Sequence, residues 1–543
     1  MENSFKISGN IVDVVRGVIF KGIVSVAGGK IISVIKSDNV DDQYIMPGFV
    51  DAHVHVESSM LVPAEFARLA VAHGTVASVS DPHEIANVLG IEGVKFMIEN
   101  SRKSPFHFCF GAPSCVPATP FETSGAVIGT GELKELLEMS EIGYLAEMMN
   151  FPGVLFNDAG VHAKLQLAKA FGKPIDGHAP GLKGDDAKSY AAAGITTDHE
   201  CYTLEEALDK IGYGMKILIR EGSAARNFDT LIPLINSHPE KVMFCSDDKH
   251  PDDLIEGHIN LLVKRAIAAG YNTMDVLRAC TMNPVKHYNL ACGLLQPGDR
   301  ADFLIADNLS DLNIHATFIR GEKVAENGKS LLPHITHELP NCFNASPVTP
   351  GELEIQAKSS RINVIEAYEG ELITGCLQED ALLENGLAIA DPSHDLLKIT
   401  VLNRYVQSSP ALGFIKGLGL KRGAIASTVA HDSHNIICAG CNDRDMARAI
   451  NLLVEHKGGI AIVNGDDEEV LPLPVAGLMS AGDGYEAARK YQLINQKVKA
   501  LGSPLHAPFM TLSFMALLVI PSLKMSDKGL FDGNNFRPAE LFV

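Results

Sequence analysis

The chain lacks the features that mark several large classes of protein. Its 543 residues include 46 Lys and Arg against 66 Asp and Glu, which gives a formal net charge of -20. An acidic surface repels the phosphates of nucleic acids and of anionic lipids, so we expect no binding to nucleic acid or to a membrane. The longest apolar run, residues 509–525, is interrupted by polar residues and is shorter than the ~20 residues of a membrane span. We expect this run to be buried.

The chain also lacks a cysteine framework and a signal for export. Its ten cysteines are scattered, and the one close pair, Cys438 and Cys441, has no second pair that would complete a structural zinc site. The first residues, MENSFKISGN, do not follow the basic-then-apolar order of a signal peptide. Reduced thiols and a cytoplasmic location are therefore expected.

The length of the chain and the changes in residue pattern along it predict three domains. Apolar residues make up 46% and charged residues 21%, as in a globular protein with a sizeable core. Short β-rich runs broken by glycines occupy residues 1–47 and 291–340, and we expect these two flanks to pair into one small, discontinuous β-sandwich domain. Residues 345–543 follow a linker rich in Pro and Asn and mix strands with a helix, which predicts a separate α/β or α+β domain.

Residues 48–290 alternate short apolar runs with helix-like stretches, which is typical of βα units and of a parallel sheet. We expect eight strands, at residues 48–55, 75–80, 106–111, 143–148, 173–178, 195–200, 214–220 and 241–247. Eight such units in about the ~250 residues of a typical example predict a (β/α)8 TIM-like barrel. An open doubly wound sheet is the alternative, although no Gly-rich phosphate loop follows the first strand. The fold class is α/β in either case.

Side chains that bind metals close several of these predicted strands. His53 and His55 point the same way because side chains alternate along a strand, and barrel active sites lie where the strands end. The ends of four other strands carry Glu147, His178, His199 and Asp247. Each residue alone has an ordinary structural explanation, but their joint placement predicts a centre of two divalent metals with one bridging carboxylate.

Several strings of the sequence resemble the adenine deaminases, a family within the amidohydrolase superfamily of metal-dependent hydrolases. They are DAHVHVESSM, DPHEIANV, APSCVPATPFETSG, AEMMNFPGV, DGHAPGL, CSDDKHPDDL, AHDSHN and LPLPVAGLMS, and they extend over nearly the whole chain. The resemblance implies two metals, Mn2+ or Fe2+, bridged by Glu147, with His53, His55 and Asp247 on one and His178 and His199 on the other.

The resemblance also implies a reaction, the hydrolysis of adenine to hypoxanthine and ammonia. A metal pair lowers the pKa of a bound water to give the attacking hydroxide, and Asp247 would carry a proton toward the departing amino group. Glu84 and His83 follow the second strand, and there they would protonate a ring nitrogen or hold the edge of the purine. The same segment, from Asp81, also resembles the start of a helix.

Other polar residues near the predicted barrel mouth are also candidates for contact with substrate, for capping or for metal binding. Glu57 and Ser58 are expected to contact substrate on the strength of the resemblance alone, and Arg220 would either contact substrate or pair with an acid. Asp248 is expected to point away from the metals and to cap a helix. The string AHDSHN, with His431, Asp432 and His434, would bind a metal or form a turn, and the sequence leaves both open.

Three other functions remain as alternatives. A hydrolase of cyclic amides on the same barrel usually bridges its metals with a carboxylated lysine, whereas the fourth strand here offers Glu147. A single-metal deaminase does not need a bridging carboxylate. A non-catalytic scaffold that binds partners would have no reason to keep all six ligands. We also expect a homodimer, because barrels of this kind often pair through exposed helices.

Overall fold

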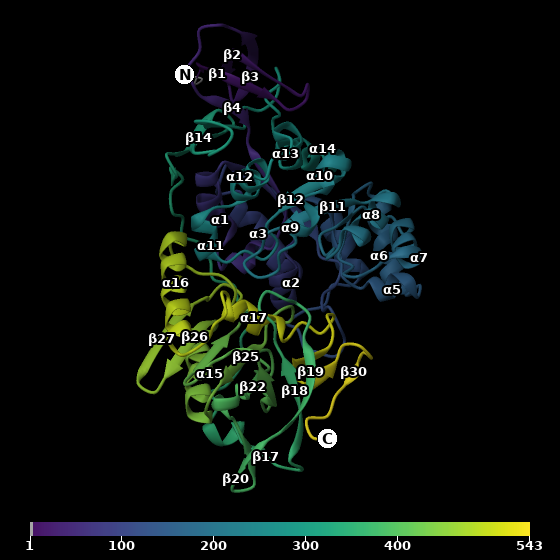
Figure 1. Cartoon of the computed structure of the whole chain (residues 1–543), viewed down its shortest axis with the longest axis vertical. Coiled ribbons are helices and arrows are strands. Elements are labelled where there is room, and N and C mark those ends of the chain that lie inside the picture. The colour runs from purple at the N-terminus through teal and green to yellow at the C-terminus, as the bar shows by residue number, and fades with distance from the viewer. Residues whose placement is uncertain (1–3) are drawn as a thin grey trace.

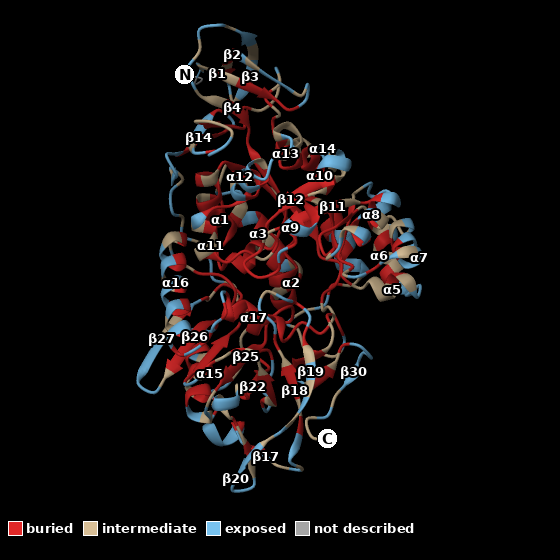
Figure 2. Ribbon diagram, viewed as in Figure 1, coloured by how far each residue is buried: buried red, intermediate tan, exposed pale blue. Residues whose placement is uncertain are grey.

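The computed structural model describes residues 4–543. Figure 1 shows three parts along the long axis, with the N-terminal strands at one end, the eight βα units in the middle and the C-terminal strands and helices at the other end. Buried residues concentrate in the strands of the middle and C-terminal parts, and exposed residues cover the outer faces of the helices (Figure 2). None of the helices in residues 4–543 has the length and apolarity needed to cross a membrane.

Eight parallel strands form the barrel that the sequence predicts. They are β5 (Phe49–Val54), β6 (Thr75–Ser80), β7 (His107–Ala112), β8 (Ile142–Met148), β9 (Ile175–Gly177), β10 (Thr197–Asp198), β11 (Lys216–Arg220) and β12 (Val242–Cys245). Strands β5 to β9 form one sheet and β10 to β12 another. Main-chain hydrogen bonds join the two sheets on both sides, from Thr196 to Ile175 (2.8 Å) and from Asp247 to His53 (2.9 Å). The ring is therefore closed, and the structure is not an open doubly wound sheet.

Helices connect the strands and cover the barrel. The helices of this part are α1 (Pro63–Ala70), α2 (His83–Leu89), α3 (Ile91–Ser101), α4 (Thr130–Glu138), α5 (Phe151–Leu155), α6 (Ala159–Ala170), α7 (Gly184–Ala192), α8 (Leu204–Gly212), α9 (Phe228–Leu231), α10 (Leu234–Ser237), α11 (Pro251–Glu256), α12 (Ile259–Ala268), α13 (Thr273–Ala279) and α14 (Met282–His287). Local sequence sets their starts, as at α8, where the Thr203 hydroxyl accepts a hydrogen bond from the N–H of Glu206 (3.2 Å). Strand β6 is buried along its whole length, as expected for a strand covered on both faces.

The two flanks of the barrel pair into one sheet. Its strands are β1 (Ser4–Asp13), β2 (Val18–Ala27), β3 (Lys30–Lys36), β4 (Tyr44–Pro47), β13 (Phe303–Ala306), β14 (Ile314–Ile319), β15 (Glu322–Glu326) and β16 (Lys329–Ser330). The order is β16-β15-β14-β13-β4-β1-β2-β3, so β4 and β13 join the flanks. Residues 1–3 of the predicted domain lie outside the described residues, and the domain limits stay predictions.

This sheet curls over its own core. The rings of Phe5 in β1 and Phe318 in β14 have centroids 5.7 Å apart. Three strand spacings separate β1 from β14, and in a flat sheet they would place these residues roughly 14 Å apart. One continuous sheet thus encloses the apolar core of this domain, whereas the expected sandwich would enclose it between two sheets.

The C-terminal part is a mixed α+β structure. Its strands are β17 (Ile355–Gln356), β18 (Arg361–Glu366), β19 (Gly375–Asp380), β20 (Leu382–Glu384), β21 (Leu387–Ile389), β22 (Leu397–Leu402), β23 (Ala411–Lys416), β24 (Ala424–Ser427), β25 (Ile436–Gly440), β26 (Gly459–Asn464), β27 (Asp467–Pro472), β28 (Leu523–Ser526), β29 (Gly529–Asp532) and β30 (Arg537–Pro538). Its helices are α15 (Asp443–His456), α16 (Gly484–Ala500) and α17 (Pro508–Phe514). The largest sheet, β19-β18-β23-β22-β25-β24-β26-β27, is antiparallel except for the β18–β23 pair.

The burial expected of the apolar run is confirmed. The apolar run at residues 509–525 forms α17 and β28, and most of its side chains are buried. All ten cysteines are free thiols, including Cys438 in β25 and Cys441 just after it.

A buried lysine joins two segments of the C-terminal part. Lys524 in β28 has no exposed surface, and its Nζ donates hydrogen bonds to the carbonyl oxygens of Leu372 (2.6 Å) and Phe514 (2.9 Å). Both acceptors are neutral, so burial lowers the pKa of the amine to about 7.

We expect the melting temperature of the wild type, relative to Lys524→Met, to rise between pH 7 and pH 9.5. An unfolded lysine has a pKa of about 10.4, so unfolding in this range takes up a proton, and a higher pH favours the folded state by up to about 1.4 kcal/mol per pH unit. Melting curves over the pH range measure the difference. The exposed Lys499→Met in α16 is the control, and a pH-independent difference for Lys524→Met would show an ordinary pKa.

Candidate active site

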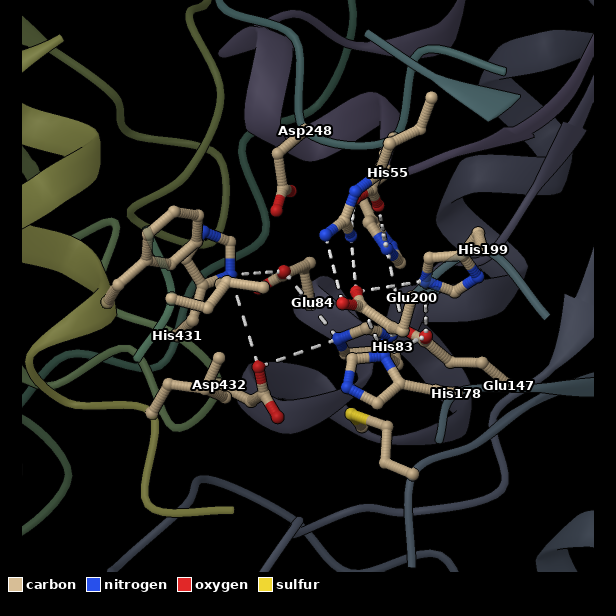
Figure 3. A pocket seen from close by; sticks show the side chains of 16 residues that line it. His55, His83, Glu84, Glu147, His178, His199, Glu200, Asp248, His431 and Asp432 are labelled. Carbon is tan, nitrogen blue, oxygen red and sulfur yellow. Dashed lines mark hydrogen bonds and ion pairs between the residues drawn. The ribbon is translucent and has the colours of Figure 1, made fainter. Parts of the chain in front are cut away.

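The C-terminal ends of the barrel strands open into a cavity that the C-terminal part of the chain covers. The barrel contributes the ends of its strands and the loops that follow them. The C-terminal part contributes Leu372, His431, Asp432, Phe514 and Leu517. Figure 3 shows side chains from both parts pointing toward one another across this cavity.

His53 and His55 lie together at the C-terminal end of β5, and His55 lines the cavity. Strand alternation sends both side chains inward, and their Nε2 atoms lie 3.2 Å apart. Two nitrogen ligands bound about 2.1 Å from one metal at near-tetrahedral angles are also a little over 3 Å apart, about the same separation. His55 is oriented further by its Nδ1, which lies 3.1 Å from the carbonyl oxygen of Asp81.

Glu147, at the end of β8, faces histidines on both sides. Its Oε1 lies 3.4 Å from Nε2 of His55, whereas its Oε2 lies 2.8 Å from Nδ1 of His178 and 3.2 Å from Nε2 of His199. Burial favours the neutral acid, but the attraction of His178 and hydrogen bonds with both of these histidines hold the pKa of Glu147 well below its usual range. An ionised carboxylate between two groups of imidazoles has the arrangement of a bridging ligand.

Asp247 divides its two oxygens between the histidines and Arg220. Its Oδ1 lies 3.5 Å from Nε2 of His53 and 3.3 Å from Nε2 of His55, and its Oδ2 accepts a hydrogen bond from Nη1 of Arg220 (2.7 Å). Burial would raise the pKa of Asp247, but Arg220 and then the two histidines hold it well below its usual range. The backbone at Asp247 has φ +52, a conformation that non-glycine residues adopt mainly at turns and functional sites.

The six predicted ligands are thus gathered in one buried cluster that fits divalent metals. Two triads have all their ligand atoms within 4.8 Å of one another: His53 with His55 and Asp247, and His53 with Glu147 and His199. Imidazole nitrogens and carboxylate oxygens suit divalent first-row metals, and a cluster of buried acceptors this dense is stabilised by a cation.

Glu200 is a site residue that the sequence analysis did not single out. It pairs with Arg220, which donates from Nη2 to Oε2 of Glu200 (2.9 Å) and also contacts the other oxygen. Oε1 of Glu200 lies 3.5 Å from Nε2 of His199. Of the two roles considered for Arg220, the structure shows pairing with acids, and a buried arginine needs such partners. In the sequence, the acids on either side of the histidine in the string TTDHE were the signal that could have identified Glu200.

The segment after β6 starts helix α2 and brings His83 close to Glu147. The carboxylate of Asp81 accepts the main-chain N–H of His83 (3.1 Å), the first residue of α2, as in an Asx turn that leads into a helix. His83 also reaches the metal-ligand cluster, because its Nδ1 lies 3.5 Å from Oε1 of Glu147. Its other ring nitrogen lies 3.6 Å from Oε1 of Glu84.

The string AHDSHN reaches the barrel mouth from the C-terminal part. Nδ1 of His431 lies 2.5 Å from Oε1 of Glu84, Nε2 of His434 contacts Oε2 of Glu84, and Oδ1 of Asp432 lies 3.7 Å from Nε2 of His83. Burial would raise the pKa of Glu84, but His431 and His434 hold it well below its usual range. No local pattern in the sequence predicts these contacts, the first of which joins residues 347 positions apart.

Glu57 and Ser58 lie behind the cavity wall. Glu57 Oε1 accepts the N–H of Ile85 (3.2 Å), and the Ser58 hydroxyl donates to Oδ1 of Asp248 (2.5 Å). Burial raises the pKa of Glu57 to about 7. Asp248 itself lines the cavity, so the expectation that it points away is wrong. The reason is that β12 ends at Cys245, and strand alternation does not extend to residue 248.

Comparisons with known proteins agree with this geometry. The family model "Amidohydrolase family" matches residues 44–324, and "Adenine deaminase C-terminal domain" matches residues 371–537. An adenine deaminase of Salinibacter ruber is 52% identical over 100% of both chains. One from Sulfurovum sp. is 54% identical over 97% of this chain and 98% of its own, and one from Methanosarcina mazei is 52% identical over 99% of each. The chain belongs to the adenine deaminase family.

Both matched parts of this adenine deaminase family member contribute residues to the cavity. The amidohydrolase match contains the six clustered residues that are predicted to bind metal, and the C-terminal match contains Leu372, His431, Asp432, Phe514 and Leu517. The resemblance found in the sequence is therefore confirmed at the level of the family, and the cavity requires both parts of the chain.

We expect Glu147→Gln to reduce bound metal to less than half of the wild-type content. Glu147 faces histidines on both sides of the cluster, and a neutral amide cannot offset the charge of two cations. Elemental analysis after dialysis measures the metal per chain. Glu205→Gln, at an exposed carboxylate of α8 that pairs only with Lys183 among the described residues, is the control. Full metal content in Glu147→Gln would rule out a bridging role.

Proposed function

We propose that this protein hydrolyses adenine to hypoxanthine and ammonia. The observation that carries the proposal is the cluster of six buried histidines and acids, the predicted ligands, at the ends of the barrel strands, beside a cavity covered by the C-terminal part. Relatives about half identical over the whole chain are named adenine deaminase, which supports adenine as the substrate.

Two divalent ions would be held by the predicted ligands, and we propose Mn2+ or Fe2+. One ion would lie on His53, His55 and Asp247 and the other on His178 and His199, with Glu147 between them. When bound, the ions would lower the pKa of a coordinated water, which supplies the nucleophile that hydrolytic deamination needs. The donor set of nitrogen and oxygen supports a divalent metal, and the choice between manganese and iron rests on the family resemblance.

Asp247 is proposed to move the proton in this reaction. It would take a proton from the attacking water and deliver it to the amino group at C6, which leaves as ammonia. Arg220 supports this role because it holds one oxygen of Asp247 while the other faces the histidines. Asp247 is ionised at neutral pH, and the ionised carboxylate is the form that accepts a proton.

Glu84 and His83 are proposed to hold the polar edge of the purine. With both oxygens next to histidines of the C-terminal part, Glu84 is ionised and would accept a hydrogen bond from a ring N–H. Met149, Leu372, Phe514 and Leu517 line the same cavity, and apolar walls of this kind suit the faces of a flat ring. Arg220, which lines the cavity, and Glu57 and Ser58 stay predicted substrate-binding residues.

We expect purified protein loaded with manganese or ferrous iron without oxygen to release ammonia from adenine. Asp247→Asn should lower the turnover number by about 10²–10⁴-fold, the usual contribution of a positioned proton carrier. An ammonia assay, with metal content measured on the same sample, tests both statements. The exposed Asp186→Asn is the control. A near-normal rate in Asp247→Asn would assign the proton transfer to another residue.

The same experiment separates the alternatives. Bound metal without ammonia from adenine would keep the metal centre and point to a cyclic amide or another purine as substrate. Neither metal nor ammonia would favour a non-catalytic scaffold. A homodimer and a cytoplasmic location stay predictions.

A further inference from the structure

Two histidines of the C-terminal part hold the carboxylate of Glu84 at both of its oxygens. Nδ1 of His431 lies 2.5 Å from Oε1, and Nε2 of His434 contacts Oε2. All three side chains are buried. In Figure 3, Glu84 lies between His431 on one side and the histidines of the barrel on the other.

The protonation of His434 follows from its second nitrogen. The main-chain N–H of Ala430 donates a hydrogen bond to Nδ1 of His434 (3.2 Å), so this nitrogen carries no proton. A neutral imidazole has its proton on the other nitrogen, which here is the Nε2 that faces Glu84. His434 therefore presents its Nε2–H to Glu84, whose Oε2 this nitrogen contacts.

This tautomer separates the cluster from a metal site. Glu84, His431 and His434 have the composition of a two-histidine, one-carboxylate site, and their ligand atoms lie close together. A protonated Nε2 has no lone pair for a metal, and each oxygen of Glu84 already has a histidine nitrogen beside it. The position of Glu84 is thus explained by its two histidine neighbours without a metal ion in the cluster.

The turn that carries the histidines is braced on several sides. The Tyr405 hydroxyl donates to the carbonyl oxygen of Ser433 (2.5 Å), and the side-chain amide of Asn435 donates to the carbonyl oxygen of Thr123 in the barrel part (2.9 Å). The main-chain N–H of His431 donates to the Ser513 hydroxyl in α17 (3.3 Å). The position of the two imidazoles is therefore set by the C-terminal fold as a whole.

We propose that His431 and His434 are positioning residues that aim the carboxylate of Glu84 into the cavity, so that the C-terminal part completes the active site of the barrel. The catalytic use of Glu84 rests on the proposed deamination. An unsupported carboxylate at this buried site would take up a proton or turn away, and in either case it would lose its fixed acceptor geometry.

The kinetic test compares His434→Leu, which removes the donor, with His434→Gln, whose side-chain N–H restores one. We expect His434→Leu to lower kcat/KM for adenine by at least 30-fold at unchanged metal content and to recover by at least fivefold in His434→Gln. The exposed His456→Leu at the end of α15 is the control and should match the wild type. Loss of a metal ion in His434→Leu would overturn the inference, because the cluster would then be a metal site.

A double-mutant cycle with Glu84→Gln separates positioning from a general loss of structure. If His434 acts only through Glu84, then His434→Leu should change kcat/KM by less than threefold in the Glu84→Gln background. Effects that multiply in the double variant would show that His434 acts elsewhere, and the inference would be wrong.

A nitrogen NMR spectrum of protein labelled at histidine gives a readout that does not depend on the reaction. We expect a neutral histidine with its proton on Nε2, whose signal is absent in His434→Leu and shifted in Glu84→Gln. This result together with no ammonia from adenine would keep the contact and reject the proposed function. A proton on Nδ1, with ammonia released, would reject the inference and keep the function.

Discussion

The buried carboxylate of Glu147 is the group on which the arrangement of the site depends. A charge without solvent is costly unless opposite charges or donors surround it, and imidazoles from three different strands or strand ends do so here. His55, His178 and His199 can only meet Glu147 if the strands that carry them run parallel and end at the same rim. The closed barrel supplies that geometry, and the carboxylate in turn offsets the cost of bringing several imidazoles together.

A second buried carboxylate helps to fix the register between the first and last strands. Asp51 in β5 accepts the main-chain N–H of Ser246 (3.0 Å) and faces Nε2 of His258 (2.8 Å). Asp51 lies two residues before His53, and Ser246 lies one residue before Asp247, so their contact sets the relative height of two predicted metal-ligating positions. The closure of the barrel and the geometry of the cluster are thus supported by the same hydrogen bonds.

The cavity is built from two sides, and the two sides contribute differently. The barrel provides the ligands and the ion pair of Arg220 with Glu200 and Asp247, whereas the C-terminal part provides apolar walls and the histidines beside Glu84. Lys524 donates hydrogen bonds to the carbonyl oxygens of Leu372 and Phe514, two of the residues that form those walls. A polar floor under an apolar cover suits a flat, polar-edged molecule that must be shielded from water during reaction.

The sequence by itself determined the eight strands, the barrel and the gathering of the six predicted ligands at one end of it, because those properties follow from local rules. Alternation along a strand puts His53 and His55 on one side, and parallel strands bring their ends together. The contacts of Glu84 with His431 and His434, and of Ser58 with Asp248, were decided by the tertiary structure alone, since they join segments far apart in the chain that share no common period. The error at Asp248 has the same origin, because the point where β12 stops, and alternation with it, depends on the packing of the whole barrel.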